Sequence, residues 1–264
     1  MLVDTHCHLD ASAFDADRPA VLATARAAGV AAFVVPAVAA TNFSAVRALA
    51  DAHEDVYFAL GIHPLFVDRA AEADLDRLRS DVDSVRSHPR FVGIGEIGLD
   101  HFAPGSDRAR QQHFLVRQLR IAREFDLPVI LHVRRSADAI ARELRRCPPP
   151  SGIAHAFNGS AQQAAQLIAL GLALGFGGAM TFTRALNIRR LAASLPAEAI
   201  VLETDAPDIA PAWVHPGRNA PAELPRIAAA LASLRSQPLA DVVRQTAAAA
   251  ARALPALAAR LTRG

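Results

Sequence analysis

In the stretch Leu2-Val-Asp-Thr-His-Cys-His-Leu-Asp10, a short apolar run leads directly into two histidines one residue apart. A dinucleotide-binding sheet would place a glycine-rich turn after its first strand, and this chain has His6 and His8 there instead. Alternate side chains of an extended strand share a face, so we expect both imidazoles on one side and a buried Cys7 thiol on the other. The pair supplies half of a metal site, although a surface His-x-His pair near a terminus would have the same sequence.

Eight short apolar runs recur along the chain, and a helical pattern follows nearly every one. Such alternation implies a parallel sheet with right-handed crossovers, and eight repeats favour closure into a barrel over an open sheet. The length of 264 residues is close to the ~250 residues typical of such a barrel. We therefore predict an α/β fold, a single (β/α)8 TIM barrel that forms one domain over residues 1–264. The predicted strands are Leu2–Asp4, Ala32–Val38, Val56–Gly61, Phe91–Glu96, Pro128–His132, Gly152–His155, Leu172–Gly177 and Ile200–Glu203.

Glycines and prolines in the second half of the chain agree with one barrel. The stretch Gly171–Gly178 lacks the G-x-G-x-x-G order, so we interpret it as close backbone packing at the barrel. The run Pro148-Pro-Pro150 marks a connection between a helix and a strand, not a domain linker. After the eighth strand, Pro225–Leu234 and Leu239–Leu261 are predicted helices, and the second is broken at Pro255.

The composition limits the environment and the partners that we expect. The chain has 28 basic residues, none of them lysine, and 26 acidic residues. The resulting net charge of +2 does not by itself indicate nucleic-acid binding. Hydrophobic residues make up 52% of the chain, but mean hydropathy is only +0.19 and no apolar run approaches the ~18 residues of a membrane span. The N-terminus has no secretory pattern and two cysteines form no disulfide framework, so we expect a cytoplasmic monomer with no membrane and no obligate protein partner.

Ionisable residues recur where the predicted strands end. In a barrel of parallel strands, these ends and the loops after them line one mouth, where active sites lie. Each residue alone has an ordinary explanation, such as a satisfied polar group or a helix cap, but so many at one rim indicate a shared site. The residues are His6, His8, His63, Glu96, His132, His155 and Asp205.

The types of these side chains favour two metal ions. Four of the histidines and two carboxylates are more ligands than one tetrahedral zinc site with an open position can use. The number matches two ions about 3.5–4 Å apart that share a carboxylate. Glu96 lies near the middle of the barrel order and is our candidate bridge. A carboxylated lysine is excluded because the chain has no lysine, which removes the dihydroorotase-like branch of the amidohydrolases. Strand adjacency assigns one ion to His6, His8 and Asp205 and the other to His132 and His155.

Six blocks of the sequence carry these residues: Asp4-Thr-His-Cys-His-Leu-Asp10, Gly61-Ile-His-Pro64, Gly93-Ile-Gly-Glu-Ile-Gly-Leu-Asp100, Leu127-Pro-Val-Ile-Leu-His132, Ala154-His-Ala-Phe-Asn-Gly-Ser160 and Leu202-Glu-Thr-Asp-Ala-Pro-Asp208. In this order they resemble the motifs of the TatD family of metal-dependent hydrolases, over most of the chain. The segment Leu131-His-Val-Arg-Arg-Ser136 and the short loop after Asp208 are most similar to the bacterial YjjV-type branch of that family.

The resemblance implies a TIM barrel of the metallo-dependent hydrolase type that holds two divalent ions and hydrolyses phosphodiester bonds in DNA. It implies that His63 and Arg134 hold the substrate phosphate, although Arg134 would also suit a structural pairing with a nearby acid. Arg135 and Ala220 stand where many members carry acidic residues, so the choice of substrate stays open. The metal ligands implied by the resemblance are His6, His8, Glu96, His132, His155 and Asp205.

Three functions are compatible with such a site, and its ions could be Zn, Mg, Mn or Ni. The first is cleavage of DNA by a water between two ions, with Glu96 as the bridge and Asp205 accepting the water proton or orienting the nucleophile. The second is hydrolysis of another ester by the same metal pair, such as a D-aminoacyl-tRNA or a small phosphoester. The third is a non-catalytic, metal-stabilised scaffold. Phe102, Phe157 and Trp213 are candidates for stacking on an unpaired base, although loop packing explains such aromatics as well.

Overall fold

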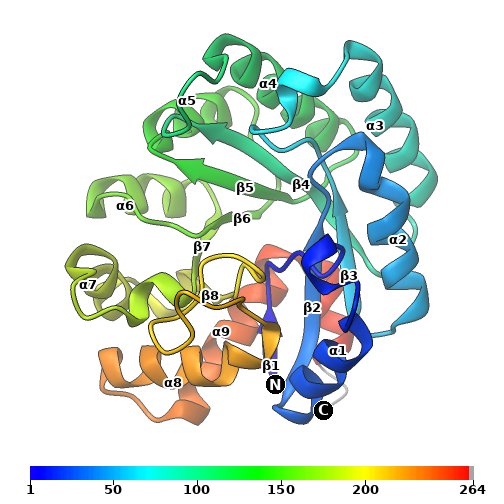
Figure 1. Ribbon diagram of the computed structural model, residues 1–264. Coiled ribbons are helices and arrows are strands. Elements are labelled where there is room, and N and C mark those ends of the chain that lie inside the picture. The colour runs from blue at the N-terminus through cyan, green and yellow to red at the C-terminus, as the bar shows by residue number, and fades with distance from the viewer. Residues whose placement is uncertain (262–264) are drawn as a thin grey trace.

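The computed structural model describes residues 1–261 and contains one sheet of eight parallel strands, in the order β1 to β8 (Figure 1). Helices cover the outside of this sheet, so the architecture is the (β/α)8 barrel that the strand–helix alternation predicted. The strands are β1 Leu2–Asp4, β2 Val30–Pro36, β3 Val56–Leu60, β4 Phe91–Asp100, β5 Val129–Arg134, β6 Gly152–His155, β7 Leu172–Phe176 and β8 Ile200–Leu202.

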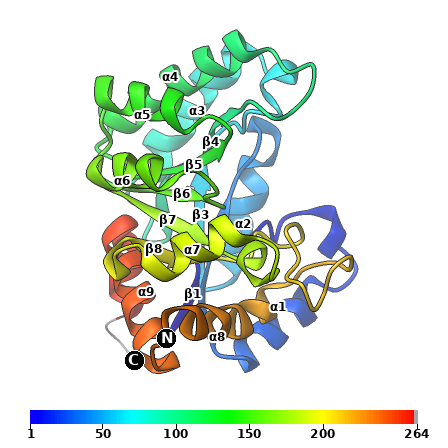
Figure 2. The ribbon, with the colours of Figure 1, turned by 90° about the vertical axis from the view of Figure 1, so that its left-hand side faces the viewer.

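The helices surround the strands, as a second direction of view shows (Figure 2). The α-helices are α1 Arg18–Ala27, α2 Phe43–Ala52, α3 Glu72–Val85, α4 Arg108–Glu124, α5 Ala137–Arg146, α6 Ala161–Ala169, α7 Leu186–Ser194, α8 Leu224–Arg235, α9 Leu239–Ala253 and the single turn α10 Ala258–Leu261. Short 3-10 turns are η1 Ser12–Phe14, η2 Ala40–Asn42, η3 Val67–Arg69, η4 Gly178–Thr181, η5 Ala197–Ala199, η6 Pro221–Glu223 and η7 Pro255–Leu257.

Side chains of the strands alternate between two apolar layers. On β2, Ala32 and Val34 belong to the cluster inside the barrel, whereas Phe33 and Val35 belong to the cluster between the strands and the helices. This period of two is the geometry of an extended strand, and burial on both sides explains why the strands are almost uniformly apolar. The interior of the barrel is therefore a packed core that supports the strand ends from below.

The segment 239–261 closes the barrel at the amino ends of the strands. Helix α9 stops at Ala253, just before Pro255, as the predicted break requires. Leu254 and Leu257 are then fully buried against the inner cluster of the barrel. The Ser151 hydroxyl donates a hydrogen bond to the Ala253 carbonyl oxygen at 2.8 Å, which attaches this segment to the start of β6. The carboxyl ends of the strands remain open to solvent.

Strands β8 and β1 meet through backbone hydrogen bonds of the residues that follow them. The Thr5 amide donates to the Leu202 carbonyl at 3.1 Å, and the Asp205 amide donates to the His6 carbonyl at 2.8 Å. The Thr204 hydroxyl also donates to the buried Asp4 carboxylate at 2.6 Å. We refer to these contacts as the seam. The seam places His6 directly beside Asp205, although the two residues are far apart in the sequence.

The histidines His6 and His8 follow β1 and do not lie in it, because the strand ends at Asp4. Their Nε2 atoms nevertheless lie 3.3 Å apart. Cys7 is fully buried on the other side, with its sulfur 3.7 Å from the Val34 carbonyl oxygen. The predicted division of these three side chains is confirmed.

Strand β4 is longer than predicted and continues four residues past Glu96. Its last residues pair with β5, with Gly98 opposite His132 and Asp100 opposite Arg134. At Gly98 the φ angle is +150°, and an added Cβ would lie 2.1 Å from the His132 carbonyl oxygen. Only glycine permits this close approach. The extension brings Asp100 to the same rim as Glu96.

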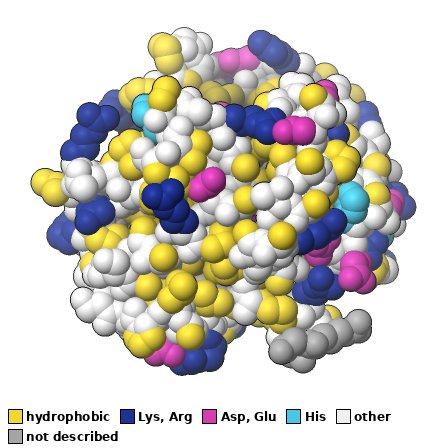
Figure 3. All heavy atoms as spheres, turned by 60° about the horizontal axis from the view of Figure 1, so that its bottom comes forward, with side chains coloured by type: hydrophobic (Ala, Val, Ile, Leu, Met, Phe, Trp, Pro, Cys, Tyr) yellow, Lys and Arg dark blue, Asp and Glu magenta, His cyan; other side chains and the backbone are white. Residues whose placement is uncertain are grey.

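The surface seen in Figure 3 carries arginine and acidic side chains interspersed, with no broad region of one charge on that face. This distribution agrees with the small net charge of +2. Among residues 1–261, no helix combines the length and the apolar character that crossing a bilayer requires.

Candidate metal centre

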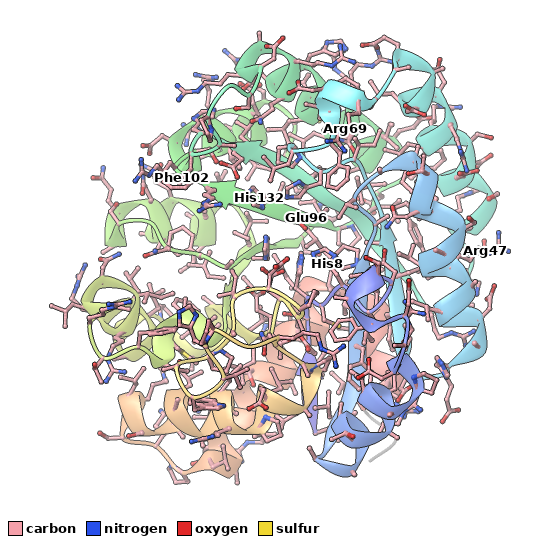
Figure 4. All side chains as sticks on the ribbon, viewed as in Figure 1. His8, Arg47, Arg69, Glu96, Phe102 and His132 are labelled. Atoms are coloured by element: carbon pink, nitrogen blue, oxygen red, sulfur yellow. The ribbon has the colours of Figure 1, made fainter. Side chains whose placement is uncertain are left out.

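The predicted site residues come together at the carboxyl ends of the strands. A cavity of about 930 Å³ opens there, and His6 contacts its lining from a fully buried position. Figure 4 shows His132, Glu96 and His8 next to one another near the centre of the barrel. The cavity is lined by His8, His63, Glu96, His132, Arg134, His155 and Asp205.

One oxygen of Glu96 faces the residues beside the seam. Its Oε2 atom lies 3.1 Å from His6 Nε2 and 3.7 Å from His8 Nε2. Asp205 Oδ1 lies 3.5 Å and 3.6 Å from the same two nitrogens. His6, His8 and Asp205, which strand adjacency assigned to one ion, thus lie together beside one oxygen of the candidate bridge.

The other oxygen of Glu96 faces a second set of imidazoles. Its Oε1 atom lies 2.9 Å from both His132 Nδ1 and His155 Nε2, and 3.2 Å from His63 Nε2. Glu96 therefore stands between two groups of nitrogen ligands, with one oxygen directed at each. The sequence implied His63 as a phosphate holder at this rim, and in the structure its distance from Glu96 falls within the range of the predicted ligands.

Several ring nitrogens face one another without room for a proton on each. His63 Nε2 is 3.1 Å from His132 Nδ1, and His155 Nε2 is 3.3 Å from the same atom. A metal ion bonds such nitrogens at about 2 Å, so two ligands of one ion lie within about 4 Å of each other. The observed spacings satisfy this limit, and a cation would relieve the opposition of the lone pairs. The residues therefore suit divalent ions. Three groups have ligand atoms close enough for this: His6, His8 and Glu96; His6, His155 and Asp205; His63, Glu96 and His132.

Burial and neighbouring charges set the protonation of these groups. Burial by itself raises the pKa of Glu96, but the surrounding imidazoles, His63 first, lower it well below the usual range. Burial lowers the pKa of His6 well below its usual value. The carboxylate and the neutral imidazole are the forms that bind metal. Burial lowers the pKa of His132 and of His155, but neighbouring carboxylates raise both above the usual value, so metal binding there would release protons. Burial also raises the pKa of Asp205 to about 6.

Asp100 is a buried carboxylate of the site that the sequence did not single out. Its Oδ2 atom lies 3.2 Å from His132 Nε2, the nitrogen that faces away from Glu96. Its Oδ1 atom accepts hydrogen bonds from the amides of Phe102 at 2.8 Å and Ala103 at 2.9 Å. Burial raises the pKa of Asp100, but these bonds, that to His132 first, lower it overall. Asp100 thus orients the His132 ring. The sequence did contain a signal for Asp100: it follows Glu96 by an even number of positions, and alternate side chains of a strand share a face.

Glu203 is a second such carboxylate, beside His155. It is 1% exposed, and its Oε1 atom accepts a hydrogen bond from the Ala156 amide at 2.5 Å and lies 3.7 Å from His155 Nδ1. Gly175 makes room for it, because a Cβ there would lie 2.1 Å from Glu203 Oε2. The predicted close packing at the glycine-rich stretch is therefore found, and at Gly175 a carboxylate occupies the space.

We expect the substitution Gly175→Ala to displace Glu203 and to destabilise the protein by about 1–3 kcal/mol, as overpacking does. Urea unfolding would measure this cost. In a Glu203→Ala background the new methyl group has space, so the cost of Gly175→Ala should fall by at least about 1 kcal/mol. Additive costs in the double variant would show that Glu203 does not occupy the space beside Gly175.

The predicted stacking residues and the predicted phosphate holder Arg134 differ in their exposure to the cavity. Phe157 is fully buried and packs in the core. The Trp213 indole donates a hydrogen bond to Glu223 at 2.6 Å. Phe102, by contrast, is 46% exposed and lines the cavity, as does Arg134. Of the three predicted stacking residues, Phe102 alone lines the cavity with an exposed ring.

Comparisons with known proteins match this chain over almost its whole length. Residues 3–255 match the family described as TatD related DNase. The chain is 41% identical to the Escherichia coli K12 protein named "Uncharacterized metal-dependent hydrolase YjjV", over 92% of this chain and 93% of the relative. It is 34% identical to "3'-5' ssDNA/RNA exonuclease TatD" of Cronobacter sakazakii, over 95% of this chain and 97% of the relative. The crystal structure of the E. coli YjjV protein superimposes with a TM-score of 0.92 at 38% identity, over 96% of this chain and 98% of that chain.

Proposed function

The chain belongs to the TatD family of metal-dependent hydrolases, and from this membership we propose that it hydrolyses phosphodiester bonds in DNA. The observation that carries the proposal is the position of Glu96, whose two oxygens face separate sets of imidazole nitrogens at 2.9–3.7 Å. The relative named as a single-strand DNA and RNA exonuclease supports a nucleic-acid substrate. The TatD-related match over residues 3–255 supports one hydrolase domain.

We propose two ion positions that share Glu96. His6, His8 and Asp205 would hold one ion, and His132 and His155 the other. His63 lies 3.2 Å from Glu96 Oε1. That position would let it hold a substrate phosphate beside the second ion, as the family resemblance implies, or complete the ligands of that ion.

Each side chain has a defined task in the proposed reaction. The two ions, when bound, would lower the pKa of water toward neutrality and offset charge on the phosphoryl oxygens. Asp205 would accept the proton of the attacking water. Arg134, whose side chain is about half exposed at the cavity, would donate hydrogen bonds to phosphate oxygens. Asp100 and Glu203 would hold the rings of His132 and His155 in place.

Removing metal should stop this activity without unfolding the chain. We expect EDTA to reduce hydrolysis of a single-stranded oligonucleotide to background, and one of Zn²⁺, Mg²⁺, Mn²⁺ or Ni²⁺ to restore it. Circular dichroism should show the same helix content before and after, because the apolar core lies below the site. Cleavage that persists at full rate in EDTA, with bound metal removed, would contradict a metal-dependent reaction.

The same assay tests the choice of substrate. Release of mononucleotides from single-stranded DNA by the metal-loaded protein would support the nuclease. Absence of cleavage with two ions bound per chain would contradict it, and aminoacyl-tRNA and small phosphoesters would then be assayed with the same preparation.

A further inference from the structure

Two consecutive arginines share one exposed aromatic ring at the outer rim of the cavity. The guanidinium carbon of Arg134 lies 4.1 Å from the centroid of the Phe102 ring, and that of Arg135 lies 4.6 Å from it. All three side chains line the same cavity as the candidate metal ligands. An aromatic face attracts a guanidinium and restricts its motion. The ring therefore holds two positive charges close together.

The backbone places both arginines on this ring. Consecutive side chains of a strand point to opposite faces, and Arg134 is the last residue of β5. Arg135 has a φ angle of +54°, in the left-handed region that arginine rarely occupies, and this turn brings its side chain back to the ring that Arg134 contacts. The Ser136 hydroxyl anchors the turn by donating to the Leu99 carbonyl at 2.7 Å. An unfavourable backbone conformation held in this way is typical of functional sites.

The charge of this group is only partly compensated. Arg134 lies 3.9 Å from Asp100, which also contacts His132. Within residues 1–261, no carboxylate lies within ion-pair distance of the Arg135 guanidinium. An exposed guanidinium without an acidic partner is suited to bind an anion, and phosphate matches its planar donors.

Apolar surface accompanies these charges around the mouth. Leu65, Phe102 and Ile209 are 47%, 46% and 40% exposed, and all three line the cavity. Large exposed apolar side chains gathered at a cavity mouth indicate a ligand with apolar parts. Flat rings joined by phosphates, as in an unpaired nucleic-acid strand, combine both properties.

The group lies outward from the candidate metal centre along a chain of contacts. His132 contacts Asp100 at 3.2 Å, Asp100 contacts Arg134 at 3.9 Å, and Arg134 lies over Phe102. In Figure 4, Phe102 lies beyond His132 on the side away from Glu96 and His8. A phosphate at this rim is therefore a different one from the phosphate at the metal ligands.

We propose that Arg135 and Phe102 form a rim subsite that binds a second phosphate of the substrate, at least one nucleotide away from the bond being cleaved, with Arg134 between this subsite and the phosphate at the metal ligands. This proposal rests on the proposed function, which supplies the nucleic-acid strand. It adds a requirement for the length of the substrate. The preferred substrate carries two or more phosphates along an unpaired strand, so a compound with one phosphodiester uses only part of the site.

The first test is binding of a fluorescent hexathymidylate with phosphorothioate linkages, which resist cleavage, to the metal-loaded protein. Arg135→Gln should weaken binding about tenfold, the factor that corresponds to about 1.4 kcal/mol. The slope of log Kd against log salt should fall by about 0.7, as expected when one contact to a single strand is lost. Phe102→Leu should weaken binding as well, because it removes the ring that holds both guanidiniums.

Two arginines serve as matched controls, because each substitution removes the same charge. Arg47 on α2 is exposed at the outer edge of the molecule (Figure 4), so Arg47→Gln should leave binding unchanged. Arg184 lines a neighbouring cavity that shares Ile209 with the active-site cavity. If Arg184→Gln weakens binding tenfold and Arg135→Gln does not, the bound strand extends from the metal ligands into the neighbouring cavity, and the rim subsite is overturned. Equal losses in all three variants also overturn it.

Catalysis provides the second test. Arg135→Gln should raise KM for unmodified hexathymidylate about tenfold, and should lower the ratio of its kcat/KM to that of bis(p-nitrophenyl) phosphate by the same factor. Cleavage of DNA with an unchanged ratio would overturn the rim subsite and leave the nuclease intact. If the protein cleaves no DNA but Arg135→Gln still weakens oligonucleotide binding tenfold, the subsite stands and the proposed nuclease activity fails.

Discussion

Replacing Glu96 by alanine should reduce hydrolysis of single-stranded DNA by about 10³-fold or more. Ions in such sites supply several kcal/mol of stabilisation to the transition state, and each 1.4 kcal/mol corresponds to about a factor of ten. Glu96 is the residue whose oxygens face both groups of nitrogens, at 3.1 Å from His6 and 2.9 Å from His132. Its removal should therefore weaken both ion positions at once. Elemental analysis of the purified variant should show a loss of metal alongside the loss of activity.

The matched control is Glu54→Ala, which makes the same chemical change at an exposed side chain that contacts Arg260, away from the cavity. Its activity and metal content should equal those of the unmodified protein. Two ions and more than a tenth of the activity in Glu96→Ala would show that Glu96 is not the bridge.

Replacing Asp205 by asparagine should reduce turnover by about 10²–10⁴-fold, the usual contribution of a positioned proton acceptor. Metal should be partly retained, because His6, His8 and Glu96 still face the same position. Asp205 has a φ angle of +57°, a conformation that asparagine also tolerates, so the backbone should not move. The variant therefore separates the chemistry of the carboxylate from its structural role.

Rates with saturating metal, measured beside the metal content, would test this separation. Asp208→Asn is a suitable control, since Asp208 lines the same cavity three residues later and has no assigned role in the reaction. Near-full activity in Asp205→Asn would refute its role as proton acceptor. Complete loss of metal would instead make Asp205 an essential ligand and leave the proton acceptor unassigned.

The sequence predicted the barrel and the gathering of the candidate metal ligands at one rim, because both depend on local patterns, whereas the end of β4 was placed four residues too early. Apolar runs at regular intervals define the strands, and residues such as His132 and His155 follow from the rule that parallel strands end at one rim. The proximity of His6 to Asp205 was predictable because the first and eighth strands are neighbours in a closed barrel. These predictions needed no knowledge of side-chain conformation.

The features that the sequence did not reveal depend on close approaches between strands. Asp100 reaches His132 only because Gly98 lets β4 continue beside β5. Glu203 fits beside His155 only because Gly175 has no Cβ. The meeting of Arg134 and Arg135 on one ring depends on a single backbone angle. Such effects arise between segments that are distant in the chain or from rare conformations, and a linear pattern does not encode them.

The seam has a consequence for the order in which the protein becomes active during folding. The Thr5 side chain donates to the Leu202 carbonyl across 197 positions of a chain of 264 residues. Contacts of this separation form late, since the intervening chain must first lose its freedom. A folding intermediate with most helices and strands in place would still lack the junction that sets His6 beside Asp205. Recovery of activity after dilution from denaturant should thus lag behind recovery of secondary structure, and would report the final step of folding.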